Sequence, residues 1–171
     1  MMKKLLFICF IVCTFVNCTT TYYTEDGRQI SKDEHNALVA EQIKNALNDR
    51  HYVIDVLTAI PQRGRMMNLS SGFSVEIKGD SIISNLPYFG RAYNLPYGGG
   101  KGLTFTELYR DYRVSHPKAD LTSIYINVDN KEDILDYKID VYDDGESSIE
   151  LITRNRDRMY YRGELNLRSK R

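Results

Sequence analysis

Cysteine is scarce in this 171-residue chain, and its placement excludes most of the chemistry that thiols support. Of the three cysteines, Cys9 and Cys13 lie inside an apolar N-terminal run that we expect to be removed, which leaves Cys18 alone. A single cysteine cannot form an internal disulfide. If Cys18 is acylated, no free thiol remains to act as a nucleophile or a metal ligand.

The chain also lacks an excess of charge of either sign. Its 23 basic and 23 acidic residues give a formal net charge of zero. Proteins that bind nucleic acid usually carry a basic patch or stripe, so the composition gives no indication of a nucleic-acid partner.

Histidine is equally sparse, and its spacing excludes the common metal motifs. His35, His51 and His116 lie far apart, and none belongs to a His-x-x-x-His pair. We therefore expect surface histidines, no metal site and no cofactor.

No apolar run is long enough to cross a membrane. The longest, Leu5 to Val16, follows Lys3 and Lys4 and ends just before Cys18. A bilayer span needs roughly 20 residues, so this pattern is typical of a secretory signal peptide. We interpret residues 1–17 as a lipoprotein signal and Cys18 as the lipidation site. The alternative is an ordinary signal peptide cleaved nearby.

The rest of the chain divides into a polar tether, residues 18–30, and a single α+β domain, residues 31–171. Ser31 and Glu34 form a capping box, which predicts that a helix begins there. Apolar residues then recur at helical spacing up to about Arg50. These residues are Val39, Ala40, Ile43 and Leu47.

After Arg50 the apolar period changes from helical to two, which predicts strands. Alternating segments are separated by turn residues such as Lys78-Gly79-Asp80 and Asp143-Asp144-Gly145. We predict one N-terminal helix packed on a mainly antiparallel sheet of about eight short strands, with one face in water. The expected strand segments are 52–57, 73–77, 81–86, 103–105, 122–128, 135–141, 149–151 and 161–165.

One aromatic and glycine-rich segment, residues 86–103, interrupts this pattern. Tyrosines can stack on sugars or pack at interfaces, and glycines let a ligand approach the backbone. The alternative is that the aromatic rings plug one end of the sheet, which we favour because buried aromatics usually belong to a core. The candidate binding residues are Tyr88, Phe89, Arg91, Tyr93, Tyr97, Gly98, Gly99, Gly100 and Lys101.

The same segment resembles a known family. The run Leu-Pro-Tyr-Phe-Gly-Arg-Ala-Tyr from Leu86, followed by Pro-Tyr-Gly-Gly-Gly-Lys-Gly from Pro96, is similar to lipoproteins of domain of unknown function 4251. Val75 to Asp80, Arg154-Asn155-Arg156 and Gly163-Glu164-Leu165 agree with it. The resemblance covers roughly residues 46–165. It implies an exported, membrane-anchored globular domain and implies no reaction.

No motif supplies a catalytic constellation. Gly98 to Gly102 lacks the Gly-Lys-Ser/Thr ending of a phosphate-binding loop. A calcium loop starting at Asp140 would have Tyr142 and Leu151 at its third and twelfth positions, where oxygen ligands are needed. Arg154, Arg156 and Arg158 would share one face if they lay on a strand, and such a face could bind acidic glycans or lipid phosphates or could simply be solvated.

We therefore expect a non-enzymatic binding or interaction domain in the cell envelope. Acyl chains on Cys18 would attach it to the outer membrane, with the domain facing the periplasm and an envelope protein or glycan as its partner. The first alternative is a periplasmic enzyme acting on cell-wall or glycan substrates. The second is a structural subunit that assembles through an exposed edge strand.

Overall fold

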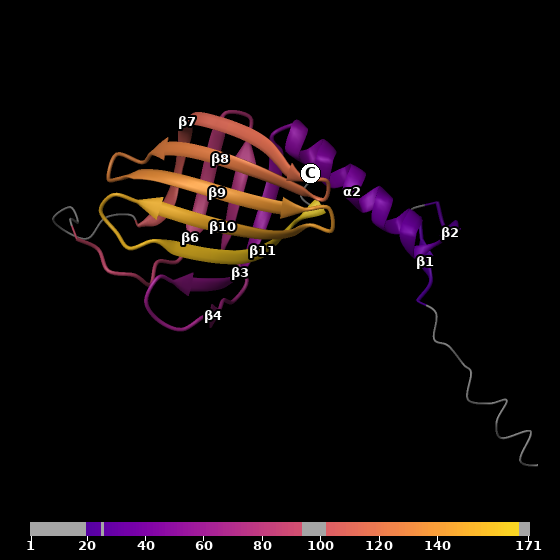
Figure 1. Ribbon diagram of the computed structural model, residues 1–171, viewed down its shortest axis with the longest axis horizontal. Coiled ribbons are helices and arrows are strands. Elements are labelled where there is room, and N and C mark those ends of the chain that lie inside the picture. The colour runs from indigo at the N-terminus through magenta and orange to yellow at the C-terminus, as the bar shows by residue number, and fades with distance from the viewer. Residues whose placement is uncertain (1–19, 25, 94–101, 168–171) are drawn as a thin grey trace, which may run out of the picture. The chain divides into compact units, whose positions relative to one another are not determined.

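Each strand of the main sheet lies antiparallel to its neighbours, and the first long strand also pairs with the last (Figure 1). The computed structural model describes residues 20–24, 26–93 and 102–167. Eight strands close into a barrel, and a ninth, β4 (Met67–Asn68), pairs with the second half of β3. The barrel strands are β3 (His51–Pro61), β5 (Ser74–Lys78), β6 (Ser81–Leu86), β7 (Leu103–Lys118), β8 (Leu121–Asp129), β9 (Ile134–Tyr142), β10 (Glu146–Thr153) and β11 (Met159–Leu165).

The seam between β3 and β11 closes the barrel. Its register runs from Met159 opposite Pro61 to Leu165 opposite Ile54, with an irregularity between Arg162 and Gly163. At Gly163 the two backbones approach so closely that a Cβ atom would lie 2.0 Å from the carbonyl oxygen of Asp55. Only glycine fits there, because a side chain would force the two strands apart.

The barrel interior is filled by the apolar residues that alternate along each strand, and three tyrosines are almost wholly buried among them. The Tyr137 hydroxyl donates to Ser84 Oγ at 3.0 Å, and the Tyr161 hydroxyl donates to the Pro87 carbonyl at 2.8 Å. The Tyr52 hydroxyl lies 3.3 Å from that of Tyr112. Burial raises the pKa of Tyr52, Tyr137 and Tyr161 well above the usual tyrosine range.

Helix α2 (Lys32–Asn48) starts where the capping box predicts. The Glu34 amide donates to Ser31 Oγ at 3.1 Å, while the Glu34 carboxylate pairs with Arg28 at 2.7 Å. Farther along, Ile43, Ala46 and Leu47 are buried in the barrel core. Within the described residues, no helix is both long enough and apolar enough to cross a bilayer.

The segment that we expected to be a tether contains a small hairpin. Strands β1 (Tyr22–Tyr23) and β2 (Gln29–Ile30) pair with Tyr22 opposite Ile30. The Tyr22 ring stacks on His35 with the ring centroids 4.4 Å apart. Short polar strands carry too few alternating residues to be recognised from sequence periodicity.

The prediction of a helix on a mainly antiparallel sheet is confirmed, and the structure adds that this sheet is a closed barrel of eight strands with a ninth strand beside it. One detail is corrected. Strand β7 extends over 16 residues to Lys118, whereas we expected a short strand at 103–105. His116 therefore lies on a strand, where its Nδ1 is 3.2 Å from Thr122 Oγ1.

Candidate functional site

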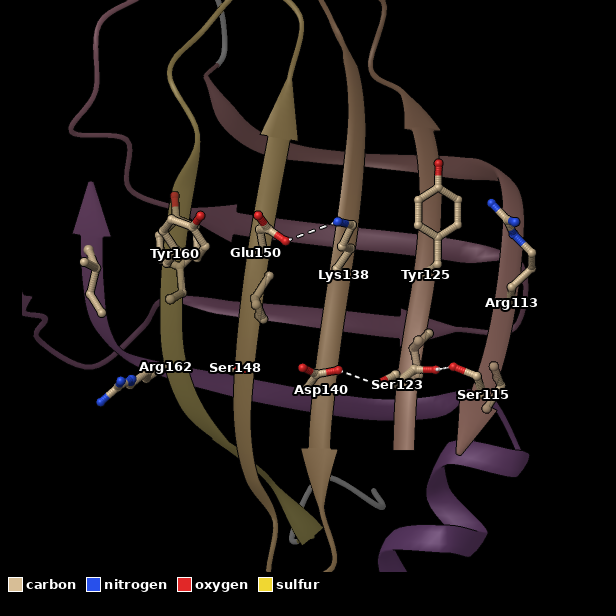
Figure 2. A pocket seen from close by; sticks show the side chains of 15 residues that line it. Arg113, Ser115, Ser123, Tyr125, Lys138, Asp140, Ser148, Glu150, Tyr160 and Arg162 are labelled. Atoms are coloured by element: carbon tan, nitrogen blue, oxygen red, sulfur yellow. Dashed lines mark hydrogen bonds and ion pairs between the residues drawn. The ribbon is translucent and has the colours of Figure 1, made fainter. Parts of the chain in front are cut away.

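The outer face of strands β7 to β11 carries two parallel rows of polar side chains (Figure 2). In each row, every residue lies opposite the next one on the neighbouring strand. The row of larger side chains, here the tyrosine row, is Arg113, Tyr125, Lys138, Glu150 and Tyr160. The row of mostly small side chains, here the serine row, is Ser115, Ser123, Asp140, Ser148 and Arg162.

The size difference between the two rows creates a hollow. Three small serine side chains leave space over the strands, and the larger side chains of the tyrosine row lie along one side of that space (Figure 2). The hollow has a volume of about 850 Å³, and Ile60 and Val114 add apolar surface at its two ends. Because strands form its floor, the lining side chains are held by the sheet and not by a loop.

Hydrogen bonds and ion pairs fix the Arg113 end of the tyrosine row. The Arg113 guanidinium lies 4.3 Å from the centroid of the Tyr125 ring and pairs with Asp111 at 2.9 Å. The Tyr125 hydroxyl donates to Asp136 at 2.6 Å, and Asn127 donates to the same carboxylate oxygen at 2.7 Å. The hydrogen bond from Tyr125 to Asp136 is the main reason that the pKa of Tyr125 is raised.

The other end of the row is held by a three-residue ion network. Glu150 accepts from Arg158 at 2.6 Å and from Lys138 at 3.4 Å. Arg158 is 3.4 Å from the hydroxyl of Tyr160, and this hydrogen bond is the largest cause of the raised pKa of Arg158. The tyrosine row therefore presents side chains whose rotamers are restrained before any ligand arrives.

The aromatic segment that the sequence singled out lies elsewhere, against the connection between β10 and β11. The Asp157 amide donates to the Arg91 carbonyl at 2.9 Å, and the Tyr93 amide donates to the Asn155 carbonyl at 2.8 Å. Ala92 forms an isolated bridge with Arg156. Residues 91–93 are thus held by backbone contacts to residues 155–157.

The described aromatic residues of this segment differ in their surroundings. Tyr88 packs against the core, and its hydroxyl donates to the Arg91 carbonyl at 2.6 Å. Phe89 and Tyr93 are 44% and 62% exposed. The Tyr93 hydroxyl donates to the carboxylate of Asp157, and this bond is the main cause of the lowered pKa of Asp157.

The three alternating arginines lie in the connection after β10, so they do not share a strand face. Arg156 is buried, with its guanidinium 5.6 Å from the centroid of the Tyr88 ring and 3.4 Å from a carboxylate oxygen of Glu132. Arg158 pairs with Glu150 of the tyrosine row, and Arg154 is exposed. In the part of the chain that the structure describes, no group of three or more His, Cys, Asp or Glu side chains is arranged to hold a metal ion.

Comparison with known proteins gives a family and a fold. Residues 34–165 match the family described as Domain of unknown function (DUF4251). The chain belongs to the DUF4251 family. The match runs from the first turn of α2 to the end of β11, so the DUF4251 domain is the helix together with the barrel.

A crystal structure of a DUF4251 family protein from Bacteroides eggerthii DSM 20697 has the same fold. The TM-score is 0.60 at 15% sequence identity, and the similarity covers 78% of this chain and 91% of that chain. The chain matches no curated protein. These comparisons establish the DUF4251 fold and leave the biochemical role to be argued from the site.

The structure places the sequence-predicted residues of this DUF4251 protein only in part. Tyr88, Arg91 and Tyr93 come together with Asp157, whereas Phe89 is exposed. Five further candidates and the lipidation site lie outside the described residues. These are Tyr97, Gly98, Gly99, Gly100, Lys101 and Cys18.

Sequence reasoning missed the two rows on the barrel surface. The signal was present in the outward positions of each predicted strand, where tyrosine, serine and charged residues alternate with the apolar ones. What the sequence did not give is the register between strands, which aligns Tyr125, Lys138 and Glu150 in one row.

Proposed function

We propose that this protein is a cell-envelope lipoprotein whose barrel binds a glycan in the hollow on the outer face of β7 to β11. The observation that carries the proposal is the restrained tyrosine row beside the serine row. A glycan ligand needs flat apolar surface for its sugar rings and hydrogen-bonding groups for its hydroxyls. Tyrosine provides the first, and serine and carboxylate side chains provide the second.

The dimensions and stiffness of the hollow support this ligand class. Ligand sites have volumes of roughly 300–1,000 Å³, and this hollow, at about 850 Å³, lies within that range. Binding costs less free energy when the side chains are already ordered. Here Tyr125 is held by Asp136 and Arg113, and Tyr160 lies beside Arg158.

The membrane attachment is the second part of the proposal. Acyl chains on Cys18 would tether the barrel to the outer membrane, with the barrel in the periplasm. Mass spectrometry of the full chain expressed in a double-membrane bacterium tests this, because processing should leave an acylated N-terminal Cys18. Cys18→Ser should release the protein from the membrane fraction. A wild-type protein cleaved elsewhere and found without lipid would contradict the anchor.

Binding is tested on the same full chain, extracted in mild detergent and titrated calorimetrically with a panel of envelope oligosaccharides. Tyr160→Ala should raise the dissociation constant about tenfold, which corresponds to a loss of about 1.4 kcal/mol of binding free energy. Tyr93→Ala, at an exposed tyrosine outside the hollow, is the matched control and should bind as wild type. If Tyr160→Ala and Tyr93→Ala weakened binding equally, the binding site would not be in the hollow. Shortening of the bound sugar would favour the enzyme alternative.

A further inference from the structure

We infer that the glycan bound in the hollow is acidic, with its anionic group on Arg162 and its hydroxyls on Asp140. This inference rests on the proposed function and adds the chemical class of the sugar. It starts from the two charged residues of the serine row, Asp140 and Arg162. Unlike the charged residues of the tyrosine row, these two form no ion pair among the described residues.

Arg162 is the cation of the hollow that forms no ion pair among the described residues, although it also lines a smaller neighbouring hollow with Asp144, Glu146 and Glu164. Arg113 pairs with Asp111 at 2.9 Å, and Lys138 pairs with Glu150 at 3.4 Å. Among the described residues, no acid lies within ion-pair distance of the Arg162 guanidinium. Its exposed side chain extends from β11 over β3, at the edge of the hollow (Figure 2).

Asp140 is the corresponding anion without a cation. Its carboxylate accepts a hydrogen bond from Ser123 Oγ, and no base among the described residues pairs with it. Ser148 lies between Asp140 and Arg162 in the register, so the two charges are two strands apart. Since adjacent strands are about 4.8 Å apart, the backbone positions of Asp140 and Arg162 are separated by roughly 10 Å.

This arrangement suits one ligand chemistry. A guanidinium binds a planar carboxylate or a sulfate through two parallel hydrogen bonds, which gives geometric specificity as well as affinity. A carboxylate such as Asp140 accepts hydrogen bonds from hydroxyls with its remaining lone pairs. Tyr160 lies two residues before Arg162 on the same face, so a sugar ring could lie beside Tyr160 while its anionic group contacts Arg162.

The experiment compares acidic sugars with neutral counterparts on the full chain in mild detergent. One pair is an oligogalacturonate and its methyl ester, and the other is a sulfated and an unsulfated maltooligosaccharide. The acidic member of at least one pair should bind at least tenfold more tightly, and added salt should reduce the difference. The pair that shows the difference identifies carboxylate or sulfate as the group recognised.

Two substitutions that each remove one positive charge test whether the preference for the acidic sugar depends on Arg162. Arg162→Gln should abolish the preference for the acidic sugar, and weaker binding of the neutral one is not expected. Arg110→Gln removes a cation on β7 that pairs with Asp129 of β8, outside the hollow, and should keep the preference. Asp140→Asn should weaken the acidic and the neutral sugar alike.

The outcomes separate this inference from the proposed function. Equal binding of acidic and neutral sugars, with both sensitive to Tyr160→Ala, would overturn the acidic class and leave glycan binding in place. A preference that survives Arg162→Gln would also overturn the inference. Failure of every sugar to bind would overturn both.

Discussion

The buried guanidinium of Arg156 lies over the ring of Tyr88 and pairs with Glu132, which joins three separate parts of the chain. Tyr88 belongs to the segment after β6, Glu132 to the turn between β8 and β9, and Arg156 to the connection after β10. In the same β8–β9 turn, Asp133 accepts hydrogen bonds from the amides of Arg154 and Asn155, both at 3.1 Å. This junction closes one end of the barrel with polar contacts.

Arg156→Met should lower the free energy of unfolding by about 2–3 kcal/mol, measured by urea denaturation. Breaking a fully buried ion pair costs about 3–5 kcal/mol, and Glu132, at 18% side-chain exposure, keeps some hydration that reduces the loss. Arg154→Met is the matched control, because that side chain is exposed, and it should change stability by less than about 0.5 kcal/mol. Equal losses of unfolding free energy in the two variants would show that the Arg156–Glu132 ion pair does not stabilise the fold.

Tyr88→Ala should destabilise the protein more than Tyr93→Ala does. Tyr88 packs on the core and donates to a backbone carbonyl, so its truncation should cost about 2–3 kcal/mol, somewhat below a fully buried aromatic. Tyr93 is 62% exposed, and its truncation should cost about 1 kcal/mol or less. Thermal denaturation of the two variants measures the difference. A larger loss at Tyr93 would contradict the packing described for Tyr88.

The hydrogen bond between Tyr93 and Asp157 predicts a specific pH dependence. Because the folded pKa of Asp157 is lowered, this carboxylate stabilises the fold above its ordinary value of about 3.8, and the stabilisation is lost as the pH falls through the lowered value. Tyr93→Phe should move the NMR titration midpoint of Asp157 upward. The stability difference between wild type and Tyr93→Phe should then shrink below about pH 3.8. An unchanged midpoint would mean that Tyr93 does not hold this carboxylate.

Gly163→Ala should be the most damaging small substitution in the barrel. The new Cβ would meet the Asp55 carbonyl, which is backbone and cannot rotate away, so a loss of more than about 4 kcal/mol is expected. Gly79→Ala serves as the control, because Gly79 has space for a Cβ and a φ of +59°, and only about 1–2 kcal/mol should be lost there. Hydrogen exchange of Gly163→Ala should show that amide protection is lost mainly on β3 and β11. Native protection of those two strands in Gly163→Ala would contradict the clash.

The hairpins were predictable because their signals are local. Alternation along Leu121–Asp129 and Ile134–Tyr142, with turn residues between them, determines both strands and their pairing. Strand β7 was largely missed, because exposed Leu108 and half-buried Glu107 break the alternation and the register shifts between Tyr109 and Asp111. That shift changes which residues face inward and hides the period of two.

The barrel and its surface hollow were not predictable for a different reason. Closure depends on the pairing of Gly163 with Val56, and periodicity carries no information about partners so far apart in the chain. The hollow depends on the same kind of information, because Ser148 and Arg162 become neighbours only through the register of two strands. The aromatic segment was identified from composition, but its contact with Asp157 was not.

The seam between β3 and β11 also has a consequence for when the protein can fold. Beside the seam, Asn166 donates to Asp55 across 111 residues of sequence, and such distant pairings form slowly because much of the chain must be ordered at once. A chain threaded through a narrow secretion channel from its N-terminus delivers β3 early and β11 late. Until β11 emerges, β3 lacks one of its three partner strands, so under the proposed export the barrel should complete only after nearly the whole chain has crossed the membrane.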